Sequence, residues 1–138
     1  MIFTVQNQET NAYRTFRIKS NEALGGSATI DIMTQRNSQG IRWYSLGFYN
    51  GTGGKYSPLV LFKNNRDSRN MRIVEILSSF NLDCEESQTW SIYELLPSRQ
   101  CIKCGEALTS PDSIRYGIGP ICAGEKFVAR SAANYGEW

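Results

Sequence analysis

Three cysteines in the C-terminal part of the chain have the spacing of metal ligands. Two residues separate Cys101 from Cys104, Gly105 follows directly, and Cys122 comes after seventeen intervening residues. Two residues between thiolates allow both sulfur atoms to face one ion, and a glycine permits a tight turn after the second thiolate. We therefore predict that these cysteines bind one structural zinc ion, Zn2+.

Tetrahedral zinc needs a fourth ligand, and the sequence leaves that ligand open. Glu125 stands three residues after Cys122 and repeats the spacing of the first pair, whereas Cys84 is the remaining cysteine and Asp112 a third option. The chain has no histidine, which excludes zinc sites that use imidazole and mechanisms that use imidazole as a general base. Buried free thiols and a redox Cys-x-x-Cys pair are the competing interpretations of the cysteines.

The segment between the cysteines predicts a short helix and a glycine-rich hairpin. Ser110-Pro111-Asp112 is typical of a helix start, with serine as N-cap and proline at the first helical position. Gly117 and Gly119 should end this helix, and a second helix is expected from Pro120. Because free backbone amides before a helix can hold phosphate, both glycines are candidate nucleic-acid-binding residues. They could instead serve only to bring Cys122 to the zinc ion. We expect no apolar core in this segment, so that the metal would replace one.

A cluster of basic residues precedes and opens another predicted helix. Lys63, Arg66, Arg69 and Arg72 lie within ten residues, and only Asp67 opposes them. The chain as a whole carries 15 basic and 13 acidic residues, a net charge of +2 that does not by itself indicate nucleic-acid binding. Local clusters of this kind can nevertheless contact phosphates, so the four residues are candidates for a nucleic-acid site.

Aromatic side chains supply candidate contacts with bases or with a partner protein. Trp43 and Tyr49 should lie on one face of a strand, where rings can stack on unpaired bases or anchor a protein interface. Tyr56 and Trp138 are further candidate anchors. Basic residues expected on the same sheet face are Arg17, Lys19 and Arg42. A solvated sheet face without a partner is the competing interpretation.

The periodicity of the remaining sequence predicts an α+β fold with a mostly antiparallel β-sheet. Alternation of apolar and polar residues predicts strands at 13–19, 28–32, 41–49, 57–62 and 90–96, and three- and four-residue steps predict one amphipathic helix within 67–80. Proline and polar residues at 97–100 then mark a boundary. We expect an antiparallel α+β domain at 1–97 and a zinc-knuckle module with a C-terminal helix at 98–138.

Residues 101–122 resemble a family of uncharacterised domains found largely in phage and prophage proteins. The shared pattern is Cys-x-x-Cys-Gly-x-x-Leu-Thr, a Pro-x-Ser, and Gly-Ile-Gly-Pro-x-Cys, and each part is present in this chain. The segments Thr15-Phe16-Arg17-Ile18 and Leu46-Gly47-Phe48 are similar to strands that precede the module in several members. The resemblance implies a phage-encoded accessory protein with a zinc-binding knuckle, and it implies no activity.

These features together favour a small non-enzymatic zinc-binding protein that binds nucleic acid. Inhibition of a host protein used in defence is the alternative, and a zinc-dependent hydrolase is a second alternative. Catalysis is disfavoured because the sequence contains no nucleotide-type phosphate-binding glycine loop and no serine elbow. No apolar run approaches about 20 residues, and the first residues lack the pattern of a secretory signal, so we expect no membrane partner and a cytoplasmic protein, in the host cytoplasm if it is phage-encoded.

Overall fold

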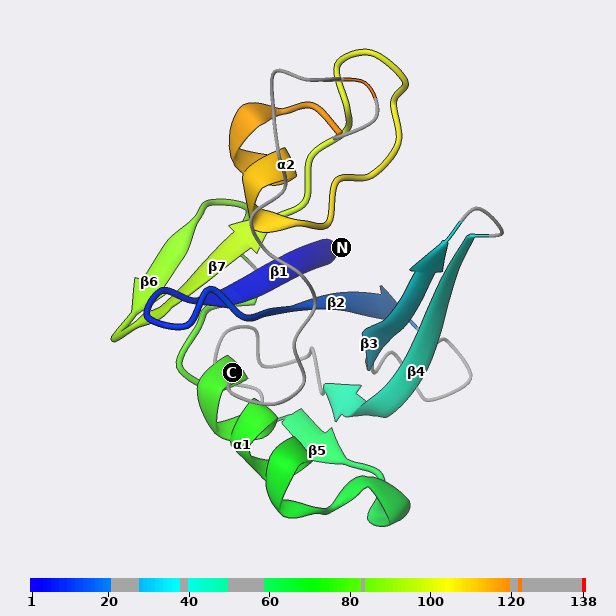
Figure 1. Ribbon diagram of the computed structural model, residues 1–138. Coiled ribbons are helices and arrows are strands. Elements are labelled where there is room, and N and C mark those ends of the chain that lie inside the picture. The colour runs from blue at the N-terminus through cyan, green and yellow to red at the C-terminus, as the bar shows by residue number, and fades with distance from the viewer. Residues whose placement is uncertain (21–27, 38–39, 50–58, 83, 120–121, 123–137) are drawn as a thin grey trace. The chain divides into compact units, whose positions relative to one another are not determined.

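A computed structural model describes residues 1–20, 28–37, 40–49, 59–82, 84–119, 122 and 138 of the chain. The chain forms two compact units (Figure 1). The first unit combines Met1–Thr15 with Glu86–Trp138, and the second comprises Phe16–Glu85. The division predicted from the sequence, at residue 97, stays a prediction.

The first unit is built on an antiparallel ladder of short strands. Its strands are β1 (Ile2–Asn7), the beginning of β2 (Tyr13–Ser20), β6 (Gln88–Trp90) and β7 (Tyr93–Pro97). They lie in the order β2-β1-β7-β6, and β7 pairs antiparallel with both of its neighbours. The short helix α2 (Pro111–Tyr116) completes the regular structure of this unit (Figure 1).

Strand β1 is buried on both faces. Phe3, Thr4 and Val5 each have no exposed surface, although threonine alternates here with the two apolar residues. The alternation is the pattern of a strand, but no strand was predicted at this position. A strand covered on both faces provides a firm base for segments that pack against it.

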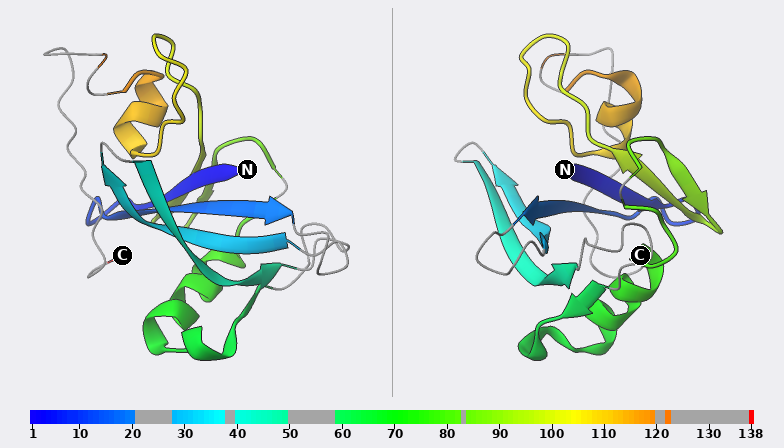
Figure 2. Two further views of the ribbon diagram at one scale, coloured as in Figure 1. Left: turned by 90° about the vertical axis from the view of Figure 1, so that its right-hand side faces the viewer. Right: turned by 180° about the vertical axis from the view of Figure 1, so that it is seen from behind.

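The second unit is a β-sheet followed by a helix. The later part of β2 is followed by β3 (Ala28–Asn37), β4 (Gly40–Tyr49) and β5 (Leu59–Leu61), in the order β5-β4-β3-β2. A 3-10 helix, η3 (Lys63–Asn65), then leads into α1 (Ser68–Leu77), which packs against β5 (Figure 2).

Helix α1 confirms the amphipathic helix predicted within 67–80. Asp67 is its N-cap, and the side chain accepts a hydrogen bond from the backbone N–H of Asn70 at 2.8 Å. Ile73, Ile76 and Leu77 are buried, which is the three- and four-residue spacing of one helix face. The apolar period of the sequence was therefore sufficient to locate this element.

The predicted strands at 13–19, 28–32 and 41–49 are confirmed. Of the predicted strand at 57–62 the structure describes residues 59–62, and β5 spans Leu59–Leu61. The segment 90–96 is not one strand, because β6 ends at Trp90 and β7 begins at Tyr93. Ser91 lies between them with φ of 55°. A left-handed serine carries little sequence signal, since glycine and asparagine are the usual residues there. Among the residues that the structure describes, none forms a helix long and apolar enough to cross a membrane.

Candidate metal centre

The first two cysteines lie on a tight turn that closes a short antiparallel ladder. Gln100 bridges to Ala107, and the backbone N–H of Cys101 donates to the carbonyl of Glu106 at 2.8 Å. The N–H of Gly105 donates a hydrogen bond to the carbonyl of Cys101 at 2.9 Å, and Gly105 has φ of 76°. Positive φ is the conformation that glycine adopts most readily, so the glycine after the second cysteine has the role predicted for it.

The third cysteine reaches the turn through helix α2. Ser110 caps this helix by accepting from the N–H of Ser113, and Pro111 occupies the first turn, as predicted. Gly117 ends the helix in the left-handed conformation, with φ of 73°. Its carbonyl accepts a hydrogen bond from the N–H of Ile102 at 3.1 Å, which fixes the end of the helix against the cysteine turn.

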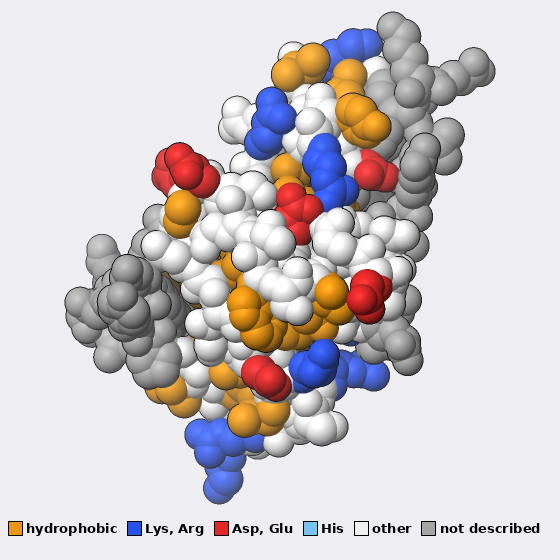
Figure 3. Space-filling model, turned by 90° about the vertical axis from the view of Figure 1, so that its left-hand side faces the viewer, with side chains coloured by type: hydrophobic (Ala, Val, Ile, Leu, Met, Phe, Trp, Pro, Cys, Tyr) orange, Lys and Arg blue, Asp and Glu red, His pale blue; other side chains and the backbone are white. Residues whose placement is uncertain are grey.

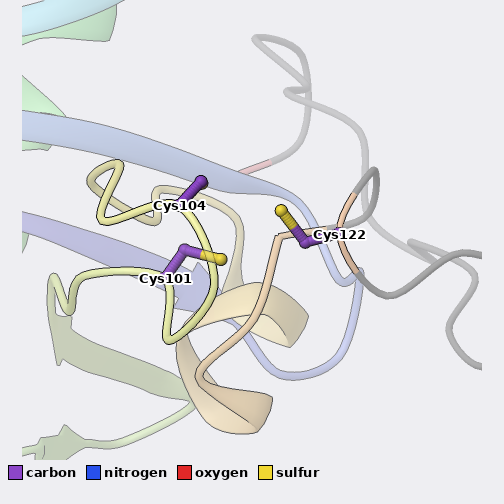
Figure 4. Close-up of side chains that lie close together, drawn as sticks. All are labelled: Cys101, Cys104 and Cys122. Atoms are coloured by element: carbon purple, nitrogen blue, oxygen red, sulfur yellow. The ribbon is translucent and has the colours of Figure 1, made fainter.

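The three sulfur atoms lie together. The Sγ atoms of Cys101, Cys104 and Cys122 are all within 4.8 Å of one another. Figure 4 shows the Cys101 and Cys122 thiols directed into the space between the turn and the segment that carries Cys122. Cys101 is buried, Cys122 is half-buried and Cys104 is exposed. The Nζ atom of Lys103 also donates to the carbonyl of Cys122 at 3.1 Å, a second link between the two segments.

Backbone amides stabilise the thiolate form of the first cysteine. Hydrogen bonds from the N–H groups of Gly119, Cys104 and Lys103 lower the pKa of Cys101 from 9.0 to about 6. Hydrogen bonds with the Cys104 and Cys101 sulfur atoms, followed by burial, raise the pKa of Cys122 to about 11. Because the ionisations of Cys101 and Cys122 are coupled, we expect both thiols to lose their protons when a cation binds.

The donor set suits a thiophilic metal ion. Three soft sulfur ligands without imidazole select Zn2+, copper(I) or an iron–sulfur cluster over hard cations. Within the part of the chain that the structure describes, no fourth cysteine or carboxylate joins the group. Glu125 lies outside the described residues, and Cys84 belongs to the other unit. Asp112 is ion-paired with Arg115 on α2, at 3.7 Å.

A small hydrophobic cluster lies beside the cysteines, so the expectation that this segment has no apolar core was wrong. Leu96, Leu108 and Ile114 are buried together with Cys101, and Ile118 packs against them. These residues are spread over the segment without helical or strand periodicity, which is why the pattern of the sequence did not reveal the cluster. A metal ion would therefore add to an existing core rather than replace one.

Buried hydroxyl groups join the cysteine module to the strands of the first unit. The Oγ1 atom of Thr4 lies 2.5 Å from the carbonyl oxygen of Thr109, and the Oγ1 atom of Thr15 lies 3.1 Å from the same oxygen. The two hydroxyls are also 2.8 Å apart. The alternation of residues 13–19 predicts a solvent-facing Thr15, and this was wrong because a residue 94 positions away covers it.

The predicted nucleic-acid-binding residues fall in different units. Lys63, Arg66, Arg69 and Arg72 are exposed in the second unit. Figure 3 shows basic and acidic side chains interspersed on one face of the molecule, in keeping with the net charge of +2. Attraction of a polyanion would therefore depend on these four exposed cations and not on a generally basic surface.

The two candidate glycines lie in the first unit, and their amides are engaged within the protein. The N–H of Gly117 donates to the carbonyl of Ser113 at 2.8 Å, and the N–H of Gly119 lies 3.5 Å from Cys101 Sγ. These bonds favour the interpretation that the glycines turn the chain and deliver Cys122. Their role in nucleic-acid binding stays a prediction.

The predicted partner-binding aromatics differ in environment. The Trp43 ring is half-buried, and the Arg17 guanidinium lies over it at 4.6 Å. Arg17 also forms a salt bridge with Asp31 at 2.6 Å. The side chain of Tyr49 lies outside the described part of the chain, as does all of Tyr56.

Trp138 is buried, so its prediction as an exposed anchor was wrong. Its Nε1 atom donates to the carbonyl of Val5 at 2.9 Å, its carbonyl accepts from the hydroxyl of Tyr93 at 2.7 Å, and the Arg14 guanidinium lies 4.9 Å from the ring centroid. The tryptophan thus contributes to the packing of the first unit. No periodicity connects it to strands more than forty residues away.

Comparison with known proteins identifies only the cysteine module. Residues 96–125 match a family model described as a family of unknown function (DUF6011). No curated protein and no solved structure matches the chain. The matched segment begins in β7 and includes Cys101, Cys104 and Cys122. The family match and the candidate metal site therefore fall on the same part of the chain.

Proposed function

We propose that the module binds a single structural zinc ion through Cys101, Cys104 and Cys122. The approach of the three Sγ atoms to within 4.8 Å of one another carries this proposal. A tetrahedral zinc ion lies about 2.3 Å from each thiolate sulfur, so small side-chain rotations bring all three atoms to bonding distance. Zinc is favoured over a redox-active metal because it tolerates a partly exposed site without changing oxidation state.

The role of this ion is to hold the segment after α2 against the cysteine turn. The protein itself already supplies a turn, a capped helix and a hydrophobic cluster at this place. We propose that the ion cross-links residues 101–104 to residue 122 through its bonds to sulfur. We also propose that the protein is not an enzyme. Glu125 and Cys84 are the two candidates for the fourth ligand.

Metal analysis tests the proposal. Protein purified without chelators should contain about one zinc per chain by mass spectrometry of the metals. Serine at any of the three clustered cysteines should abolish stoichiometric zinc, and Cys84→Ala and Glu125→Ala should identify the fourth ligand by the loss of zinc in only one of them. Protein without bound metal would refute the proposal, and iron with visible absorbance would replace zinc by an iron–sulfur site.

We further propose that the second unit binds nucleic acid through Lys63, Arg66, Arg69 and Arg72. The supporting observation is that these four side chains are exposed while Asp67, the acidic residue among them, caps α1 through Asn70. Electrostatic binding of this kind weakens steeply as salt rises, because it releases counterions from phosphates. A phage source is a further part of this hypothesis.

An electrophoretic mobility shift at several salt concentrations tests the nucleic-acid proposal. Binding should weaken with salt, and replacing Arg66 and Arg69 by glutamine should flatten the salt dependence. Pull-down from host lysate, with and without nuclease, separates this function from the alternative of a host-protein inhibitor. A partner retained after nuclease, together with binding that salt does not alter, would favour the inhibitor and contradict the proposal.

A further inference from the structure

Tyr44 on strand β4 is exposed and yet held in place. The residue is 50% exposed to solvent. Its hydroxyl donates to the Oδ1 atom of Asn65 at 2.5 Å. Asn65 is buried, and its Nδ2 atom donates to the carbonyls of Ser45 and Leu46 at 2.9 and 3.0 Å. The ring is thus held at its hydroxyl end, so that less side-chain entropy is lost when a ligand binds to it.

The same asparagine belongs to the segment that carries the basic side chains. Asn65 is the last residue of η3, so Lys63 belongs to the same turn and Arg66 follows directly, both of them exposed. The backbone carbonyl of Asn65 accepts from the Nδ2 atom of Asn70 at 2.9 Å, which ties η3 to the first turn of α1. Arg69 lies in that turn and is also exposed.

We call Tyr44, Lys63, Arg66 and Arg69 the Tyr44 surface. It combines one exposed aromatic face with three cations in a single unit of the protein. Trp43, which the sequence favoured as a stacking residue, differs in that Arg17 covers its ring and is itself paired with Asp31. Tyr44 rather than its neighbour therefore has an aromatic face open to a ligand.

We propose that the Tyr44 surface binds single-stranded nucleic acid, with one base stacked on the Tyr44 ring and the flanking phosphates on Lys63, Arg66 and Arg69. This inference rests on the proposed nucleic-acid binding and narrows it to unpaired strands. Every base offers a π-face, but only in a single strand is that face available to a side chain. In a duplex the bases stack on one another, so the tyrosine would find no partner and only the cations would contribute.

Fluorescence anisotropy with two forms of one labelled oligonucleotide tests the inference. The full chain, purified with its metal, is titrated with a 12-nucleotide single strand of mixed sequence and with the duplex of the same sequence. We expect the single strand to bind about tenfold more tightly or better, because a stacked base adds affinity that the duplex cannot gain. Tyr44→Ala should remove most of this difference, and Tyr44→Phe, which retains the ring, should preserve it.

Matched variants separate stacking from charge and from folding. Tyr44→Ala should leave the salt dependence unchanged, whereas Arg66→Gln with Arg69→Gln should flatten it. Tyr116→Ala, at a tyrosine that is 68% exposed in the other unit, should alter neither quantity. Equal affinity for both forms, with no effect of Tyr44→Ala, would overturn the inference and leave the proposed nucleic-acid binding intact. Salt-dependent binding to neither form would overturn both, and a lysate protein that survives nuclease and requires Tyr44 would assign the surface to a protein partner.

Discussion

The backbone N–H of Gly119 donates a hydrogen bond to the Sγ atom of Cys101 at 3.5 Å. Gly119 stands three residues before Cys122, so the segment that delivers the third sulfur also stabilises the negative charge of the first. Amides of Cys104 and Lys103, on the cysteine turn itself, point to the same atom. The site is thus arranged for a thiolate at Cys101 before any metal binds.

A thiolate should form at Cys101 near pH 6 in the metal-free protein. Because hydrogen bonds from Gly119, Cys104 and Lys103 lower its pKa to about 6, one equivalent of thiolate absorbance near 240 nm should appear around that pH. Hydrogen bonds with the Cys104 and Cys101 sulfur atoms, and then burial, raise the pKa of Cys122 to about 11, so its thiolate should appear well above the pH at which Cys101 ionises. Cys101→Ser should remove the early step, and an unchanged profile in this variant would contradict the assignment.

The same shifts give a sign to the pH dependence of stability in the metal-free protein. The pKa of Cys101 is lower in the folded state than its ordinary 9.0, so its contribution is complete above pH 9 and is lost as pH falls through 6. The pKa of Cys122 is raised, so its contribution is present below pH 9 and is lost as pH rises through 11. Urea midpoints measured across this range, with Cys84→Ala as the control, should show both limits.

Alanine should be harmful at Gly117 and tolerated at Gly119. Gly117 has φ of 73°, and an added Cβ would lie 3.1 Å from the Arg99 guanidinium. Gly117→Ala should therefore cost about 1 kcal/mol or more and weaken metal binding, because the turn to Cys122 is strained. Among the described residues, an added Cβ at Gly119 would meet only Leu108 Cδ2, at 3.7 Å, and alanine keeps the N–H that bonds to Cys101.

Zinc affinity by competition with a chromogenic chelator distinguishes these variants. Gly119→Ala should match the wild-type affinity, and Gly117→Ala should bind zinc measurably more weakly. If Gly119→Ala were the weaker of the two, Gly119 would act through its lack of a side chain rather than through its hydrogen bond to Cys101.

Short-range signals made the cysteine module predictable. The two-residue spacing of Cys101 and Cys104, the serine and proline that open α2, and the glycine at 117 each act within a few residues. Such signals survive in a sequence because their physical cause is local: a turn, a cap, or a backbone dihedral. The prediction of three clustered sulfur atoms followed from them, and the geometry supports it.

Long-range packing was not predictable in the same way. Thr15 looked like a solvent-facing strand residue, but the carbonyl of Thr109 lies against it. Tyr44 and Asn65 are twenty-one positions apart, and nothing in either residue type indicates that they meet.

Removing the two buried threonine hydroxyls together should cost more than the sum of the single changes. Thr4 and Thr15 have one hydroxyl hydrogen each, yet they make three contacts: two with the carbonyl of Thr109 and one with each other. In either Thr→Val variant the remaining hydroxyl can still donate to that carbonyl, so each should cost about 1 kcal/mol. The double variant removes both donors from a buried carbonyl. Urea unfolding of the four proteins gives the coupling, and strict additivity would show that the hydroxyls act independently.

Gly47 should not tolerate a side chain, because the backbone of β5 occupies the position that a Cβ atom would take. Gly47 lies opposite Leu61 in the ladder, and an added Cβ would be 2.1 Å from the backbone oxygen of Val60 and 2.7 Å from the Cα of Leu61. Both contacts are with backbone, so the strands must separate to admit a methyl group, and overpacking of this kind costs about 1–3 kcal/mol. Gly47→Ala should lower the urea midpoint of unfolding, measured by far-ultraviolet circular dichroism, while Gly119→Ala serves as a control for replacing a glycine by alanine. A midpoint equal to wild type would mean that β5 does not approach β4 this closely. Because α1 packs against β5, the position of α1 would then differ as well.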